Sequence, residues 1–408
     1  MKIAFATIYD LRDVRRGSGT FHFLAKELER QGHPVDYVGP FEGMEFPLAT
    51  RFFRRAAVAT GRRYRSWQDP FAGRRLGALV TRSLCSVDCD LLLTNDFAVA
   101  GYVRTHKPVV LYTDAMFPHR YNEDVNPRLW HLSRMSVRFC QHIRRTGLSQ
   151  ARVSVFPTNW AAEEALKYGV ADKMRIAVVP FGANLLAPPE AVLNRRVLGE
   201  GLTKRRFRLL FVGKDWIGKG GAIAVESTTE LRKRGSDATL DVVGVGPSSG
   251  EAAEGVVFHG LIDKSEAAGR ERIHQLFMES DALILPTWAE GFGIAAVEAA
   301  AYGLPTLAYR SIGISEAVRD GESGVLVPRG SRGEAFAAIV EDWFENPSSY
   351  ELMAQRARET FDANFSWERI ANRLIREIQS RLHGPACSPR IGNAKGLSEC
   401  RDNARFTE

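Results

Sequence analysis

The sequence lacks several features that would assign a protein to a class at once. Its five cysteines stand at irregular positions, and such an odd set argues against a disulfide framework and favours reduced thiols in a cytosolic protein. Cys85 and Cys89 resemble half of a zinc site, but no second Cys or His pair follows at a suitable distance. No stretch approaches the ~20 apolar residues that cross a bilayer. We therefore expect reduced thiols, no bound metal and no membrane-spanning helix.

Two further absences narrow the class. The chain begins directly with the strand-like segment KIAFATI, without the pattern of a secretory signal, which favours a cytoplasmic location. The formal charge of +7 favours anionic partners, but no known nucleic-acid-binding module accompanies the basic residues, so we expect no nucleic-acid partner. With 408 residues, of which 45% are apolar, the chain suits a globular protein of two domains.

The first half has the pattern of an α/β unit with a parallel sheet. Lys2–Thr7 is a short apolar strand, Gly17–Thr20 ends a polar loop, and an amphipathic helix precedes a second strand at Val35–Val38. Because the loop lacks the full G-x-G-x-x-G pattern, a flexible loop with a Ser/Thr cap is an alternative. The remaining strands are predicted at Leu91–Leu93, Val109–Tyr112, Val153–Phe156 and Ile176–Val179.

Asp114 is the titratable group of this half that is best placed to meet a ligand. It follows the strand Val109–Tyr112, and the carboxyl ends of parallel strands border the ligand crevice of open α/β sheets. His119 lies in the loop beyond it. The alternative is that Asp114 only caps a helix.

Residues 51–75 hold eight arginines mixed with Phe, Tyr and Trp. A helix over 51–65 would combine a basic face with aromatic anchors, which suits an anionic membrane or an acidic, lipid-linked substrate. The other interpretation is a solvated helix whose arginine stems cover apolar surface.

The second half repeats the α/β pattern after a connecting segment, residues 183–206, that contains prolines and has a basic end. Helical segments are predicted at 348–362 and 366–382, and the polar residues 384–408 are predicted to form a disordered tail. Six strands are predicted at Phe207–Val212, Leu240–Val243, Val256–Phe258, Ala282–Leu285, Thr306–Ala308 and Gly324–Val327.

A glycine-rich turn follows the first strand of this second half. It contains Lys214 and Lys219, which can place positive charge on a diphosphate at the carboxyl edge of the sheet. It is not a Walker loop, because Gly220 stands where Ser or Thr is needed. Two exposed lysines in an ordinary turn are the alternative.

The stretch Asp281–Gly303 is the most informative part of the sequence. Gly291-Phe292-Gly293 leads into an alanine-rich helix that begins near Ile294, and the unpaired N–H groups of such a helix end form an anion site. Glu290 precedes the turn and Glu298 lies about one turn inside the helix. Two carboxylates would repel phosphates unless they are aimed at hydroxyls. The pattern therefore indicates a ligand with phosphate and sugar hydroxyls, although a capped helix with two solvated glutamates fits the spacing equally well.

These segments resemble a known family. FVGKDWIGKGG, LDVVGVG, VVFHG, DALILPTWAEGFGIAAVEAAAYGLPTLAY and ISEAVRDGESGVLVP are similar to motifs of glycosyltransferase family 4, group 1 type, which are retaining enzymes of the GT-B fold. The resemblance is strong over 207–330 and weaker through the GSGT loop and VVPFGAN. It implies two Rossmann-like domains that face each other across a cleft. The acceptor-side domain would span 1–182, the nucleotide-sugar-binding domain 207–365, and the helix 366–382 would pack back on the first.

The resemblance also implies roles for single residues. Lys219 would contact the donor diphosphate, and Lys214 would assist it, although many members have Arg at this second position. Glu290 would meet hydroxyls of the transferred sugar, and Glu298 would bind the ribose. Asp114 stands where many members have His, which puts the group beside the reacting sugar in doubt. Backbone N–H groups would take the phosphates, namely those of Gly19, Phe292, Gly293 and Ile294.

The reaction that the resemblance implies is transfer of a hexose from a nucleotide diphosphate sugar to an acceptor hydroxyl, with retention and without a metal or cofactor. The acceptor would be a glycan, a lipid-linked molecule or a small molecule, in the synthesis of a glycan, glycolipid or cell-surface polysaccharide. Residues 51–75 would hold the protein at the inner face of a membrane. The alternatives are a GT-B-fold nucleotide-sugar epimerase or phosphorylase, and a non-catalytic nucleotide-sugar-binding protein.

Overall fold

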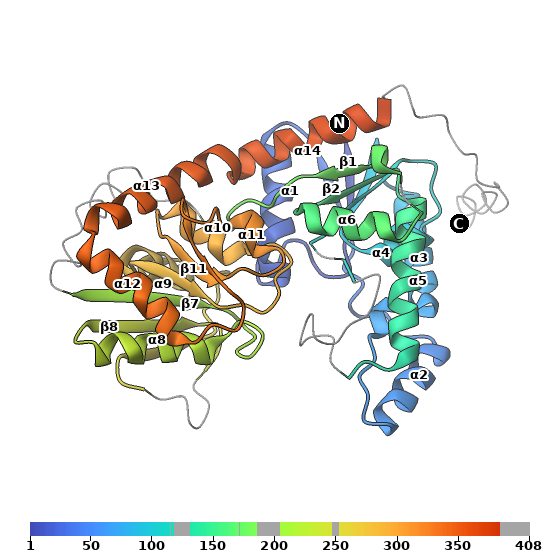
Figure 1. Ribbon diagram of the computed structural model, residues 1–408. Helices are drawn as coiled ribbons and strands as arrows, with labels where there is room; N and C mark the ends of the chain where they lie inside the picture. Colours follow the sequence, from blue (N-terminus) through green and yellow to red (C-terminus); the bar gives the residue numbers. More distant parts are fainter. Residues whose placement is uncertain (115, 118–130, 171, 186–204, 247–252, 384–408) are drawn as a thin grey trace, which may run out of the picture.

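Two parallel sheets of six strands form the two lobes of the molecule, as Figure 1 shows. The computed structural model describes residues 1–114, 116–117, 131–170, 172–185, 205–246 and 253–383. Most of the predicted linker, the predicted tail 384–408 and His119 lie outside these residues. The predicted fold, an α/β chain with two Rossmann-like sheets, is confirmed.

The first lobe contains one sheet between two layers of helices. Its strands and helices are β1 (Ile3–Ala6), α1 (Thr20–Arg30), β2 (Val35–Val38), α2 (Leu48–Ala59), α3 (Pro70–Leu84), β3 (Leu91–Thr94), α4 (Phe97–Tyr102), β4 (Val109–Tyr112), α5 (Arg134–Gln150), β5 (Val153–Phe156), α6 (Asn159–Lys167) and β6 (Ile176–Val178). The strand order is β2-β1-β3-β4-β5-β6, and every pair is parallel. Because helices cover both faces, the central strands are fully buried and mainly apolar, with Thr94 and Ser154 as buried hydroxyl residues.

The second lobe repeats this layered arrangement and ends in three long helices. Its elements are β7 (Arg206–Val212), α8 (Gly221–Lys233), β8 (Asp237–Val243), β9 (Val256–Gly260), α9 (Ala267–Glu279), β10 (Ala282–Leu285), α10 (Ile294–Ala301), β11 (Thr306–Tyr309), α11 (Ile314–Ala317), β12 (Gly324–Val327), α12 (Gly333–Glu345), α13 (Pro347–Asn364) and α14 (Trp367–His383). The strand order is β12-β11-β10-β7-β8-β9. Helices α8 and α12 pack on one face, and α9, α10 and α11 pack on the other.

The order of the strands determines where a ligand can bind. In each sheet the chain first adds strands on one side of its first strand and then crosses to the other side. This switch occurs between β1 and β3 in the first lobe and between β7 and β10 in the second. Loops that leave such neighbouring strands diverge to opposite faces, and the crevice between them is the usual ligand site of open parallel sheets.

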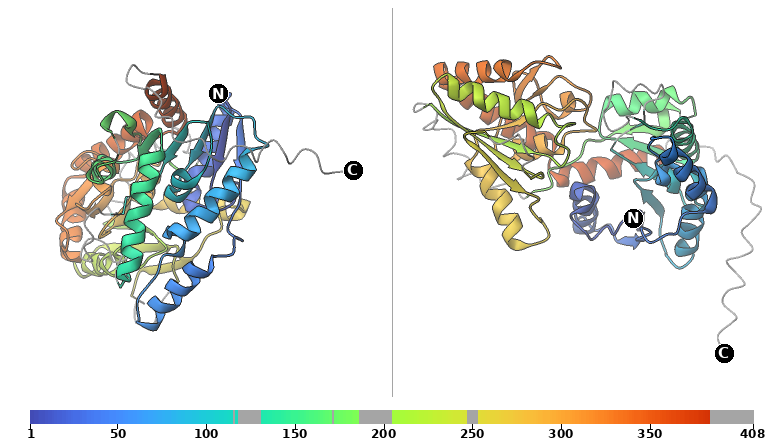
Figure 2. Two further views of the ribbon diagram at one scale, coloured as in Figure 1. Left: turned by 90° about the vertical axis from the view of Figure 1, so that its right-hand side faces the viewer. Right: turned by 90° about the horizontal axis from the view of Figure 1, so that it is seen from below.

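The two lobes are joined by the last helix and by an aromatic contact. Figures 1 and 2 show α14 running from the second lobe back along the first. There Arg373 donates a hydrogen bond of 2.8 Å from Nη2 to the Val178 carbonyl. Between the lobes, the ring of Phe292 meets Phe181 at 5.7 Å and Phe365 at 6.0 Å between centroids. The apolar core therefore continues from one lobe to the other.

Two expectations need correction. The helix predicted over 51–65 is present but its bounds differ, because α2 spans Leu48–Ala59 and the chain turns at Gly61 with a φ of 65°. A positive φ is open to glycine and closes the helix at a point that the mixture of arginines and aromatics does not mark. The expectation that all thiols are reduced is also wrong, because Cys85 is disulfide-bonded, whereas Cys89 and Cys140 are buried free thiols. Sequence spacing does not determine such pairing.

Candidate active site

Two glycine turns meet at the switch point of the second sheet. The loop after β7 reaches α8 through Gly220, whose φ is 75° and where an added Cβ atom would lie 2.2 Å from the carbonyl oxygen of Pro286. The hydroxyl of Thr287 and the backbone N–H of Trp288 both donate to the Gly218 carbonyl, each at 3.2 Å. Only glycine fits this close approach of two backbones. The loop after β7 is thereby held against the loop after β10.

Lys219 and Glu290 form an ion pair across these two loops. Their side chains are 15% and 14% exposed, so solvent screens the contact only weakly. The contact holds the carboxylate of Glu290 beside the glycine turn that precedes α10. The structure thus brings two of the predicted site residues into direct contact.

Glu298 has a lysine partner that the sequence patterns did not reveal. Its side chain is only 3% exposed, and Oε1 accepts a hydrogen bond of 3.1 Å from Nζ of Lys264. Lys264 belongs to the loop between β9 and α9, far from Glu298 in sequence. A carboxylate with so little solvent needs such a partner, because burying an unpaired charge is costly. The predicted ribose-binding glutamate is therefore oriented by a residue from another loop.

The two lysines remove the electrostatic conflict that the sequence posed. Each glutamate near the predicted anion site has its own lysine at contact distance, so the two pairs together carry no net charge. The N-terminus of α10 then remains attractive to an anion, because its cap residue is Gly293, with a φ of 101°, and within the described residues no side-chain cap hydrogen bond is found there. Lys214 is exposed at the same edge, and no ion pair of it is found within the described ranges.

Phe292, Gly293 and Ile294 place the start of α10 at this edge. Phe292 is 3% exposed and packs between the lobes, which anchors the turn. At Gly293 an added Cβ atom would lie 2.6 Å from Cδ1 of Ile314, so the turn is also packed against α11. These backbone positions are the ones predicted to receive phosphate. Over the described parts of the chain, no cluster of His, Cys, Asp or Glu side chains suits a metal ion.

The switch point of the first sheet gathers polar side chains, of which the sequence pattern predicted Asp114 but not Tyr9. Nδ2 of Asn95, which follows β3, donates a hydrogen bond of 3.0 Å to the hydroxyl of Tyr9, which follows β1. Burial, followed by the nearby carboxylate of Asp114, raises the pKa of Tyr9 well above its usual value. The phenol is therefore protonated at neutral pH and can donate a hydrogen bond. Asp114 itself is exposed after β4.

The glycine loop before α1 lies beside Tyr9. Gly17 and Gly19 have φ values of 53° and 84°, and a Cβ atom added at Gly17 would lie 2.7 Å from the Tyr9 hydroxyl oxygen. Asn184, which is 1% exposed, donates from Nδ2 to the carbonyl of Ser18 at 2.9 Å. The loop that is predicted to close over phosphates is thus fastened to the segment that leaves the first sheet.

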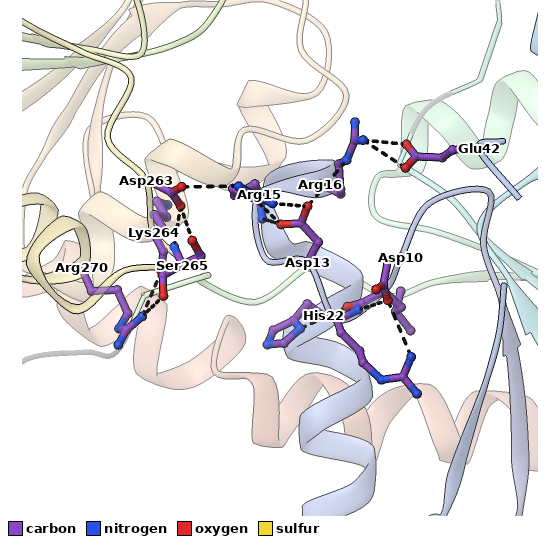
Figure 3. Close-up of polar contacts among 12 residues, drawn as sticks. Asp10, Asp13, Arg15, Arg16, His22, Glu42, Asp263, Lys264, Ser265 and Arg270 are labelled. Atoms are coloured by element: carbon purple, nitrogen blue, oxygen red, sulfur yellow. Dashed lines mark hydrogen bonds and ion pairs between the residues drawn. The ribbon is translucent and has the colours of Figure 1, made fainter. Parts of the chain in front are cut away.

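The same loop also reaches the second lobe. Figure 3 shows Arg15 between Asp13 of its own loop and Asp263, which is the residue before Lys264. Nη1 of Arg15 lies 3.5 Å from Oδ2 of Asp263, and their side chains are 57% and 36% exposed. A wet pair of this kind contributes little stability. Its value is positional, because it connects the loop before α1 to the loop that orients Glu298.

Comparisons with known proteins identify the family. A family model described as "Glycosyltransferase Family 4" matches residues 20–185, and one described as "Glycosyl transferases group 1" matches residues 199–360. These matches cover the two lobes in turn and together span most of the chain. The chain belongs to the group 1 glycosyltransferases of family 4.

Curated relatives of this glycosyltransferase match it over part of their length. D-inositol 3-phosphate glycosyltransferase of Rhodococcus opacus (strain B4) is 30% identical over 263 residues, which cover 60% of this chain and 58% of the relative. The protein of the same description from Arthrobacter sp. (strain FB24) is 31% identical over 223 residues, which cover 52% and 51%. The chain thus spans about half the length of the curated relatives it matches.

Solved structures with the same fold are glycosyltransferases and related enzymes. HepE of Anabaena in complex with UDP and glucose has a TM-score of 0.59 at 18% identity, over 93% of this chain and all of that one. Sucrose-phosphate synthase of Thermosynechococcus elongatus has a TM-score of 0.64 at 17% identity, over 93% and 98%. WaaG, described as a glycosyltransferase involved in lipopolysaccharide biosynthesis, has 0.62 at 17%, over 91% and 98%. At these identities the likeness establishes the GT-B fold alone.

Proposed function

We propose that this glycosyltransferase moves a hexose from a nucleoside diphosphate sugar to an acceptor hydroxyl with retention at the anomeric carbon. The observation that carries the proposal is the pair of lysine-held glutamates, Glu290 and Glu298, on either side of the N-terminus of α10. The helix end suits the diphosphate, and the carboxylates suit hydroxyls of the sugar and the ribose. The solved HepE complexes with UDP and with UDP-glucose make UDP-glucose the first donor to test.

The reaction breaks the bond between the anomeric carbon and the diphosphate oxygen and forms a bond from that carbon to the acceptor oxygen. Retention is explained if both events occur on the same face of the sugar. The acceptor proton then passes to the departing phosphate oxygen, and the products are the nucleoside diphosphate and the glycoside. Lys214, Lys219 and the N–H groups of α10 stabilise the charge that develops on the diphosphate. We propose that this set makes a divalent cation unnecessary, so transfer would persist in EDTA.

Glu290 would orient the sugar rather than react with it. A carboxylate that accepts hydroxyl hydrogen bonds at one end of the hexose holds the anomeric carbon near the acceptor, and such positioning contributes strongly to rate. In the first lobe, Asp114 and Tyr9 would contact the acceptor or the reacting face of the sugar. Asp114 then has a positioning role, because the leaving phosphate serves as the base.

The acceptor that we propose is anionic or lipid-linked. The curated relatives are described as acting with D-inositol 3-phosphate, which is an anionic polyol. Residues 46–87, which include α2 and α3 and which we call the arm of the first lobe, carry the opposite, positive charge. Between Phe46 and Val87 the one acidic residue is Asp69, which is buried as the cap of α3, whereas arginines recur throughout. We place the reaction in the synthesis of a glycan, glycolipid or cell-surface polysaccharide.

In a cytoplasmic protein, helix α2 would bind this arm to the inner face of a membrane. Leu48, Phe52 and Val58 are 79%, 67% and 67% exposed, and Arg51, Arg54 and Arg55 are exposed beside them. Figures 1 and 2 show α2 at the tip of the first lobe. Exposed apolar side chains among arginines suit the interface of an anionic bilayer. No helix within the described residues is long and apolar enough to cross a membrane.

The test is an incubation of the protein with UDP-glucose and other nucleotide sugars, with and without D-inositol 3-phosphate or a lipid acceptor. Nucleotide release and the NMR coupling of the anomeric proton in the product report transfer and stereochemistry. Inversion would contradict the proposal. Conversion of the donor without an acceptor would indicate an epimerase, and a requirement for inorganic phosphate a phosphorylase. Binding of the donor without hydrolysis or transfer would indicate a non-catalytic protein.

A further inference from the structure

The N-terminus of α6 in the first lobe is capped by a carboxylate from the second lobe. Oε2 of Glu316 accepts hydrogen bonds from the backbone N–H of Asn159 at 2.7 Å and from its side-chain Nδ2 at 2.8 Å. Oε1 of Glu316 accepts from the backbone N–H of Trp160 at 3.2 Å. Figure 1 shows α6 and α11, which carries Glu316, facing each other at the junction of the lobes.

This cap provides acceptors for N–H groups of α6 that the first lobe leaves without a side-chain partner in the described residues. The first N–H groups of a helix have no partner inside the helix. Within the first lobe, Thr158 is buried and its hydroxyl accepts from the N–H of Ala161 at 3.2 Å. The N–H groups of Asn159 and Trp160 obtain their acceptor from Glu316 instead. A carboxylate at a helix N-terminus also gains from the helix dipole, and hydrogen bonds to a charged group are stronger than neutral ones.

Glu316 is also joined closely to the donor turn. The N–H of Glu290 donates to the carbonyl of Ile312 at 3.1 Å. Gly313 has a φ of 84°, and a Cβ atom added there would lie 2.1 Å from the carbonyl oxygen of Glu290. The segment that carries Glu316 is therefore packed backbone to backbone against the turn that carries Glu290. A movement of the first lobe that shifts Glu316 would therefore also shift the turn that carries Glu290.

We propose that Glu316 is a positioning residue that holds the two lobes in register for transfer. The proposal rests on the function proposed above, in which the second lobe holds the donor and the first holds the acceptor. Transfer then requires the anomeric carbon and the acceptor oxygen to meet at near-contact distance, and a small misplacement is costly in rate. Glu316 fixes this placement through three hydrogen bonds. The polar link between Arg15 and Asp263 is longer and more exposed to solvent, and it contributes less.

The decisive test substitutes, singly and together, the two residues of the contact between the lobes, Asn159 and Glu316. Asn159→Asp replaces the Nδ2 donor by a carboxylate oxygen that faces Glu316, and like charges at such a contact are strongly unfavourable. An acidic residue at the first position of α6 suits the helix dipole, so the first lobe keeps its fold. We expect kcat/KM for transfer to fall about tenfold or more. Binding of UDP, measured by calorimetry, stays within about twofold, because UDP binds to the second lobe.

The combined variant gives the result that separates this proposal from a merely structural role. Glu316→Gln alone lowers kcat/KM severalfold, because it removes the charge from the helix cap. In the Asn159→Asp background the same change removes the repulsion, so it raises kcat/KM. Glu322→Gln is the matched control, since Glu322 lies nearby in the chain and pairs with Arg319 at the surface. This control changes neither rate nor shape.

Small-angle X-ray scattering reports the lobes independently of chemistry. We expect a larger radius of gyration for Asn159→Asp than for the native protein, and a return toward the native value in the double variant. The role of Glu316 would be overturned if the loss of kcat/KM in the double variant equalled the combined losses of the two single variants. It would also be overturned if Asn159→Asp left both the radius of gyration and the rate at their native values. If the protein transfers no sugar at all, the proposed function fails, whereas the scattering still decides whether Glu316 holds the lobes.

Discussion

The two switch points of the molecule differ in how far their charged groups are already arranged. In the second lobe, Glu290 and Glu298 are each paired with a lysine and shielded from solvent before any ligand is present. In the first lobe, Asp114 is exposed, and Tyr9 and Asn95 form a neutral hydrogen bond. A nucleotide offers the same phosphates and ribose in every reaction, so a preformed site suits it. With the roles proposed above, the comparison teaches that the donor site of the second lobe is preorganised, whereas the first lobe leaves room for acceptor specificity.

The largest effect is expected at the preorganised site. Glu290→Gln keeps the shape of the side chain but removes the charge that pairs with Lys219. We expect kcat to fall by about 10² or more, because the hexose loses its orientation, with the fold intact by circular dichroism. Nucleotide release in the presence of acceptor is the measurement. Near-native turnover would show that Glu290 does not orient the sugar, and the difference between the two lobes would then have no bearing on transfer.

Lys219→Met should act mainly on donor binding. The variant removes a charged partner of the diphosphate and leaves Glu290 as an unpaired carboxylate beside it. We expect the KM for the nucleotide sugar to rise at least about tenfold, with a smaller change in kcat. Initial rates over a range of donor concentrations separate the two. Lys233→Met is a control, because Lys233 lies on α8 and pairs with Glu230 at the surface. An unchanged KM in Lys219→Met would contradict the donor role.

Asp114→Asn probes the open site of the first lobe. We expect kcat/KM for the acceptor to fall about tenfold while UDP binding is unchanged, because the change affects only positioning on the acceptor side. The carboxylate contributes to the raised pKa of Tyr9, so its removal should lower that pKa. A spectrophotometric titration of the phenol follows the shift. A loss of donor affinity instead of acceptor turnover would mean that Asp114 belongs to the donor half.

Lys264→Met tests whether pairing supports the second lobe itself. The variant leaves the buried carboxylate of Glu298 without its cation, and we expect the free energy of unfolding to fall by about 2 kcal/mol, less than for a fully buried pair because Lys264 is partly exposed. Urea unfolding measures this. Adding Glu298→Gln should recover stability but not UDP affinity. Equal stability of Lys264→Met and the native protein would show that Glu298 does not need this partner.

The smallest effect on chemistry is expected in α2. Arg54→Gln with Arg55→Gln should weaken binding to anionic vesicles about tenfold or more while leaving transfer to a soluble acceptor unchanged. Co-sedimentation with phosphatidylserine vesicles is the measurement. The same change at Arg369 and Arg376, which are exposed on α14, controls for total charge. Equal loss of vesicle binding in both double variants would mean that net charge, and not α2, attracts the membrane.

Local sequence patterns predicted the sheets well. Short apolar runs such as Val109–Tyr112 and Ala282–Leu285 have the predicted bounds, because strands covered on both faces are mainly apolar. β8 begins three residues earlier than predicted, since pairing with β7 extends it through Asp237 to Thr239. Pairing partners decide such ends, and α2 ended early for a similarly local reason, the positive φ at Gly61.

The sequence by itself determined the α/β class, the glycine turns and the presence of Glu290, Glu298, Lys214 and Lys219 near one sheet edge, because these depend on short-range patterns and on the rule that parallel strands share a carboxyl edge. Only the tertiary structure decided which charges neutralise one another. Lys264 reaches Glu298, Glu316 reaches Asn159, and Asn95 reaches Tyr9 from segments that are distant in the chain. Side-chain pairing across crossovers and between lobes follows from strand order and lobe packing, which leave no periodic trace in the sequence.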